Sequence, residues 1–110
     1  MSAEKLAALQ LFYPTAELLT EGGQIVVFLP GLTVETPQGL VETDALLLPS
    51  LHSTGYTTRL FLARQIEAPS AKNWTSHSLC GRSWWACSWQ GVGADLPWID
   101  MIANHLRAFR

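Results

Sequence analysis

The chain has 110 residues, a mass of 12.1 kDa, and 48% hydrophobic but only 15% charged residues. This length and composition predict one globular domain over residues 1–110 and exclude two folded domains. No apolar run approaches the roughly 20 residues that a membrane-spanning helix needs, so we expect no role in a membrane. The net charge of −2 argues against a nucleic-acid-binding protein, which would present a net basic face.

The charge is distributed unevenly along the chain. Residues 1–55 carry one lysine and six carboxylates, a net −5, whereas residues 56–110 carry six basic and three acidic side chains, a net +3. Such asymmetry fits docking to charged protein partners, and it also fits two ordinary solvated faces. The first residues lack the basic start and apolar core of a secretion signal, and two cysteines are too few for a disulfide scaffold. We therefore expect a cytoplasmic protein with reduced thiols.

Two helices are predicted, one near each end of the chain. Ser2 can cap the first, whose apolar residues recur at helical spacing until Pro14 ends it. Asp95 is the expected N-cap of the second, and Pro97 lies in its first turn. The apolar faces comprise Leu6, Leu9 and Tyr13 in the first helix and Ile99, Ile102, Leu106 and Phe109 in the second. We expect the C-terminal helix to pack against a sheet.

Between these helices the pattern predicts four strands. They are residues 16–20, 24–29, 40–48 and 57–66, separated by short turn sequences that contain glycine or proline. Short links between consecutive strands predict an antiparallel meander. Residues 67–82 are too polar and too broken for regular structure, so we expect a long loop there. The predicted fold is therefore α+β: an N-terminal helix, a four-stranded antiparallel meander, a cysteine-bearing loop and a C-terminal helix packed on the sheet.

The strong local signatures of catalysis and metal binding are missing from the sequence. It has no glycine-rich phosphate loop, no Cys-x-x-Cys, no His-Glu-x-x-His and no Gly-x-Ser-x-Gly. Cys80 and Cys87 are separated by six residues, and the three histidines are scattered, so a tetrahedral metal site would need distant residues to converge. We therefore expect no metal and no bound cofactor.

Cys80 is the strongest candidate for a reactive side chain. It ends the polar loop, follows His77 by three positions and precedes Gly81-Arg82. A neighbouring cation lowers the pKa of a thiol, and glycine lets a substrate approach the backbone closely. The alternative is that Cys80 is a small buried hydrophobic residue. That description fits Cys87 better still, because Cys87 lies in an apolar segment rich in tryptophan.

Four tryptophans fall within fifteen positions of the sequence, namely Trp84, Trp85, Trp89 and Trp98. Two roles fit them. Aromatic side chains bury large areas, so these residues can pack the last helix on the sheet, which is the commoner use in a small domain. Alternatively, they form an exposed platform, in which case the chain is an interaction module with inert cysteines. Tryptophan exposure distinguishes these two interpretations.

The order of features, from Thr15 to Phe109, resembles that of the ubiquitin-conjugating enzymes. In that family a strand like Arg59–Ile66 leads to the catalytic cysteine, and a tryptophan follows before the next helix. Cys80 and Trp89 stand at nearly that spacing. The segments Leu40–Leu62 and Gly81-Arg82-Ser83-Trp84 resemble more closely the short bacterial branch of the superfamily. Proteins of that branch are associated with ubiquitin-like modifiers, activating-enzyme homologues and JAB-type peptidases in operons linked to antiphage defence.

The resemblance implies a carrier that accepts a ubiquitin-like protein as a thioester on Cys80 and transfers it to a target. Asn73 would stabilise the oxyanion, and His77 would assist deprotonation of the acceptor. The implied partners are the ubiquitin-like protein and its activating enzyme, with a JAB-type peptidase in the same pathway. No cofactor is implied for this chain, because the activating enzyme consumes the ATP.

An alternative within the same resemblance is a catalytically inactive variant. The sequence lacks the His-Pro-Asn triplet of the family, and Gln90 stands where the bacterial branch commonly has a histidine. These departures favour a binding or scaffold subunit for a ubiquitin-like protein or its activating enzyme. If the chain is a carrier after all, the sequence leaves open whether Cys80 or Cys87 is the nucleophile.

Overall fold

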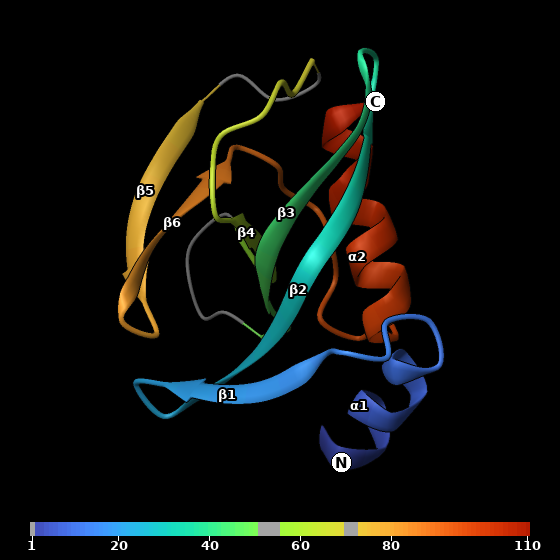
Figure 1. Cartoon of the computed structure of the whole chain (residues 1–110). Coiled ribbons are helices and arrows are strands. Elements are labelled where there is room, and N and C mark those ends of the chain that lie inside the picture. The colour runs from blue at the N-terminus through green and yellow to red at the C-terminus, as the bar shows by residue number, and fades with distance from the viewer. Residues whose placement is uncertain (1, 51–55, 70–72) are drawn as a thin grey trace.

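The computed structural model describes residues 2–50, 56–69 and 73–110 (Figure 1). The elements in chain order are α1 (Ser2–Gln10), β1 (Glu17–Glu21), β2 (Gln24–Thr36), β3 (Gly39–Leu48), β4 (Arg59–Leu62), β5 (Trp74–Leu79), β6 (Arg82–Cys87), α2 (Trp98–Leu106) and the 3-10 turn η1 (Arg107–Phe109). All six strands belong to one antiparallel sheet with the order β1-β2-β3-β4-β6-β5. The chain therefore leaves β4, forms the outermost strand β5 and returns through β6 to the side of β4.

The predicted four-stranded α+β arrangement is wrong, because the described sheet has six strands. Residues 67–82 do not form one long loop: residues 74–79 are β5, and β6 follows after a tight turn. The polar composition misled the prediction. An edge strand with one solvated side needs little apolar alternation, since its backbone hydrogen bonds to β6 hold it in place. The predicted fourth strand, residues 57–66, is in turn too long, because β4 covers only Arg59–Leu62.

The segment Pro30-Gly31 distorts β2 instead of ending it. The register between β2 and β3 shifts between Leu29 and Leu32, and Gly31 has a φ of 62°, a conformation that suits glycine. The backbone N–H of Gly31 donates a hydrogen bond of 2.9 Å to Oδ1 of Asp44 on β3. This bulge lets β2 continue to Thr36 and bend, so β2 and β3 form the long curved hairpin at the centre of Figure 1.

The main core lies between one face of this sheet and the C-terminal helix. Alternate residues of β2, β3 and β4 point into it, and Met101 and Ile102 of α2 are fully buried against them. On this face Trp98 is buried, and Trp89 donates a 3.0 Å hydrogen bond from Nε1 to the backbone oxygen of Asn104. The C-terminal helix thus packs against the sheet. Its N-cap position is taken by Pro97 and not by the predicted Asp95, because the helix begins at Trp98.

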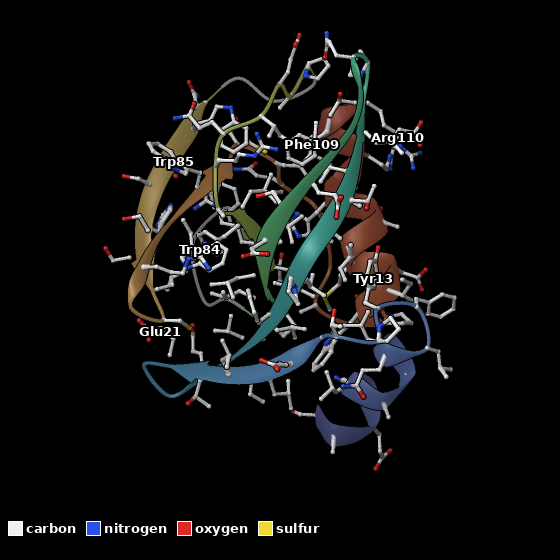
Figure 2. All side chains as sticks on the ribbon, viewed as in Figure 1. Tyr13, Glu21, Trp84, Trp85, Phe109 and Arg110 are labelled. Atoms are coloured by element: carbon white, nitrogen blue, oxygen red, sulfur yellow. The ribbon has the colours of Figure 1, made fainter. Side chains whose placement is uncertain are left out.

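The opposite face of the sheet is also packed, because the sheet curls over itself. Its buried residues are Val26, Leu46, Leu48, Phe61, Trp84 and Ala86. Trp84 lies inside the bend between the β5–β6 hairpin and β1–β2 (Figure 2), where its ring is 6.4 Å from that of Phe28. Its Nε1 donates a 3.0 Å hydrogen bond to the backbone oxygen of Leu79. All five tryptophans are thus buried or half-buried, which favours packing over an exposed aromatic platform.

A buried polar contact joins α2 to the chain before β4. The Thr58 hydroxyl donates a hydrogen bond to the backbone oxygen of Val92, at 2.9 Å. Since that hydroxyl has a single proton, His105 donates from Nε2 to Thr58 Oγ1 across 2.8 Å. Burial, with a smaller effect from Arg59, lowers the pKa of His105 from 6.5 to about 4. The imidazole is therefore neutral in the folded protein at neutral pH.

This buried histidine predicts a loss of stability in mild acid. Between pH 6.5 and about 4 the unfolded chain binds a proton at His105 that the folded chain does not, so acidification favours unfolding. The loss attributable to His105 should reach about 3 kcal/mol as the pH falls through this range. We expect His105→Gln, which keeps a donor but does not titrate, to remove that part of the loss. Urea unfolding of both proteins at several pH values checks this, and an unchanged pH dependence in His105→Gln would contradict it.

Candidate functional site

Cys80 lies in the turn of the β5–β6 hairpin. Leu79 pairs with Arg82, so only Cys80 and Gly81 connect the two strands, with φ values of 50° and 77°. Two successive residues with positive φ are typical of a type I′ turn, which favours asparagine followed by glycine. A Cβ on Gly81 would meet nothing within 4 Å, so no close approach explains this glycine. The Cys-Gly sequence thus serves to reverse the chain.

The surroundings of Cys80 suppress its thiolate. The side chain is half-buried and borders a hollow lined by Leu18, Leu19, Thr20 and Ile25. Glu21 lies at the end of β1, close to the β5–β6 turn (Figure 2). Burial, and to a smaller extent the Glu21 carboxylate, raises the pKa of the Cys80 thiol. An activated cysteine needs the opposite shift.

The three residues expected to act together do not meet. Asn73 directly precedes β5 and Cys80 directly follows it, so the six-residue strand holds them about 20 Å apart. Asn73 is tied instead to Ser88, whose Oγ accepts from the Asn73 backbone N–H at 3.2 Å. His77 lies within β5, where its ring contacts that of Phe61 at 5.0 Å and its Nε2 is hydrogen-bonded to Thr75. The structure therefore gives Cys80 no contact with Asn73, and it directs His77 toward Phe61 and Thr75.

Cys87, the alternative nucleophile, ends β6 and is buried in the main core. Burial raises the pKa of its thiol, although a backbone hydrogen bond and Arg59 act in the other direction. Both cysteines are free thiols. Within the described ranges, no group of three or more histidine, cysteine or acidic side chains is placed to hold a metal ion. Neither cysteine is therefore set up as a nucleophile or as part of a metal centre.

A different polar cluster assembles on the face of the sheet that carries Phe61. Arg59 of β4 reaches across β6, and its Nη2 lies 3.4 Å from Thr75 Oγ1 on β5. The Thr75 hydroxyl and His77 Nε2 share a hydrogen bond of 2.7 Å. Three polar side chains from β4 and β5 are thus linked in a row: Arg59, Thr75 and His77. We call this row the Arg59 cluster.

Aromatic rings hold the guanidinium of the Arg59 cluster in place. Its carbon lies 4.0 Å from the centroid of Tyr56 and 5.8 Å from that of Phe61, and both distances are typical of cation–π contacts. Partial burial, and then the Arg59 charge, lowers the pKa of His77. The cluster therefore presents one permanent cation beside an imidazole that is neutral at neutral pH.

Sequence reasoning identified His77 but missed its partners. The alternation in β4 does indicate that Arg59 and Phe61 point away from Leu60 and Leu62. No local signal shows that the side chain of Arg59 meets Thr75, because the prediction contained no β5. Detecting the contact requires the β4–β6 pairing, which joins residues 23 positions apart, Leu62 and Trp85.

Comparisons with known proteins add no family to this description. No protein-family model, curated protein or solved structure matches the chain. In the part of the chain that the structure describes, neither helix is long and apolar enough to span a lipid bilayer. A functional proposal must therefore be supported by the sequence features and by the geometry of these residues.

The environment of Cys80 predicts a weakly acidic thiol. In Cys87→Ala, the remaining thiol should titrate above its ordinary pKa of 9.0 and react slowly with iodoacetamide at neutral pH. Glu21→Gln should lower that pKa, since it removes a nearby negative charge, whereas Glu17→Gln at the other end of β1 should change it less. Thiolate absorbance against pH measures these values. A Cys80 pKa below the ordinary value would contradict this description of the turn.

Proposed function

We propose that this chain is a non-catalytic subunit of a conjugation pathway, binding a ubiquitin-like protein or its activating enzyme. The geometry of Cys80 carries the proposal: its thiol lies in a tight turn, has a raised pKa, and is a strand's length from Asn73. Membership of the pathway is supported by sequence features that resemble the short bacterial branch, chiefly Gly81-Arg82-Ser83-Trp84. The proposed setting is the cytoplasm, with a JAB-type peptidase acting in the same pathway.

A carrier would need chemistry that this arrangement does not favour. Thioester exchange begins with attack by a thiolate, and the raised pKa leaves little of that form at neutral pH. The oxyanion that forms needs a donor about 3 Å away, and Asn73 is roughly 20 Å from Cys80 along β5. A binding role requires neither group. In a binding subunit both residues have structural roles. Cys80 forms the hairpin turn, and Asn73 contacts Ser88.

The uneven charge of the chain supports a role in holding partners. One edge of the sheet, β1, carries Glu17 and Glu21, and Arg59 of β4 reaches toward the other edge strand, β5. Surfaces of opposite sign attract partners of opposite charge and orient them. Two proteins held on one subunit meet at a raised effective concentration, which promotes their reaction without any bond to the subunit.

A charging assay tests this proposal. Purified protein is mixed with a cognate ubiquitin-like protein, its activating enzyme and ATP, and the mixture is run on a gel with and without reducing agent. We expect no reducible adduct on this chain, and calorimetry should show binding to the modifier or to the activating enzyme. Cys80→Asn should bind as the unmodified protein does, because asparagine suits the first position of a type I′ turn and supplies no thiol.

Three results would contradict the proposal. A reducible adduct that disappears in Cys80→Ala would make Cys80 the nucleophile of a carrier. Loss of the adduct in Cys87→Ala would assign that role to Cys87. Failure of the folded protein to bind either partner, with the partners active in their own assays, would remove the chain from the pathway.

A further inference from the structure

Among the residues that the structure describes, no carboxylate forms an ion pair with the cation of the Arg59 cluster. The one ion pair in the described residues joins Arg82 to Asp44, at 3.5 Å. Arg59 Nε is fully buried, and no described group accepts a hydrogen bond from it. A guanidinium offers five donors, and here the 3.4 Å contact with Thr75 is a long one. The cluster therefore retains a strong capacity to bind an acceptor with negative charge.

The cluster lies beside an unpaired edge of the sheet. β5 is the outermost strand and pairs only with β6 in the described sheet, so the other side of its backbone is free for a further strand (Figure 1). Natural edges are commonly blocked by lysine, proline or a bulge. Residues 74–79 contain neither lysine nor proline, and their pairing with β6 is regular throughout. This edge is consequently open to strand addition.

The position of the cluster selects the charge of an added strand. A new strand would lie about 4.8 Å beyond β5, so a side chain opposite Thr75 on the same face would extend toward Arg59. An acidic side chain there meets a cation, whereas a basic one would be repelled. The opposite edge, β1, begins with Glu17 and ends with Glu21, so it would repel the same segment. The net charge of +3 over residues 56–110 also favours an acidic segment at the β5 edge.

We propose that β5 binds an extended, acidic segment of a partner protein as a seventh strand, and that Arg59, Thr75 and His77 receive its carboxylate. The guanidinium supplies the charge-assisted hydrogen bonds, and the Thr75 hydroxyl and the imidazole line the same position on β5. Backbone pairing with β5 supplies affinity, and the carboxylate fixes which residue of the segment lies opposite Thr75. This proposal does not depend on a ubiquitin-like pathway.

A pair of synthetic peptides tests the proposal. The first is acetyl-Thr-Val-Thr-Glu-Thr-Val-Thr-amide, and the second has glutamine in place of its glutamate. Binding is followed by NMR through the backbone amides of residues 74–79 and the ring of His77. We expect the glutamate peptide to shift these signals and to bind about tenfold more tightly than the glutamine peptide. Added salt should reduce this difference, because it is electrostatic.

Arg82 provides a matched control on the same face of the sheet. Its guanidinium carbon lies 4.5 Å from the ring centroid of Trp84, much as Arg59 lies over Tyr56, but Asp44 already neutralises it. Arg59→Gln should abolish the preference for glutamate, and Arg82→Gln should retain it. Thr75→Val, at an exposed position, should weaken the preference and serves as a second variant if Arg59→Gln does not fold.

Several results would overturn the proposal. Equal affinity of the two peptides would show that Arg59 does not select a carboxylate. Shifts confined to β1, or the absence of shifts in β5 with either peptide at millimolar concentration, would show that β5 is not the docking edge. An unchanged preference in both Arg59→Gln and Thr75→Val would place the selecting group elsewhere.

Discussion

The antiparallel pairing of β4 with β6 is the contact on which the rest of this sheet depends. It is short, with Leu62 opposite Trp85, yet it attaches the whole β5–β6 hairpin to the strands before it. Side chains on both faces reinforce it. Leu62 lies in the main core under α2, and Phe61 packs with Trp84 and Ala86 on the other side. Without this pairing, the β5–β6 hairpin would lose its alignment with the rest of the sheet and the apolar side chains that pack against it.

Packing on both faces explains the unusual composition of the central strands. A strand with one solvent-exposed face alternates apolar and polar residues. By contrast, β3 ends in the continuous buried run Ala45-Leu46-Leu47-Leu48. Odd positions of this run enter the main core and even positions enter the second cluster.

The two tight hairpins show why sequence patterns predicted one part of the sheet and missed another. Gly22 and Gly23 have φ values of 57° and 80°, and two glycines before a β-branched run are a strong hairpin signal. The turn at Cys80-Gly81 has the same left-handed conformation. Its first residue is cysteine, which rarely adopts that conformation, so the pair gave no turn signal. The polar residues before it, with His77 and Gly81-Arg82 nearby, instead suggested a loop that ends in a reactive residue. The second cluster compensates for the turn, since the Cys80 side chain packs against it.

The Arg59 cluster could not be found from local patterns, because its members come from strands that are not adjacent. Arg59 on β4 reaches over β6 to Thr75 on β5, so its position depends on the sheet order and not on any sequence motif. Its electrostatic influence crosses the sheet as well. The Arg59 charge contributes to the lowered pKa values of His77 and His105 and opposes the effect of burial on Cys87.

An arginine whose charge acts on several neighbouring side chains, as Arg59 does, is usually paired with a carboxylate. Arg82 is paired with Asp44 in this way. Aromatic stacking on Tyr56 fixes the position of the Arg59 guanidinium without neutralising its charge. The buried Nε of Arg59, which has no acceptor among the described groups, therefore costs stability. A carboxylate bound beside Thr75 would pair with the Nη donors of Arg59 and neutralise its charge. This is the physical reason why we assign the cluster to recognition of a partner and not to the stability of the fold.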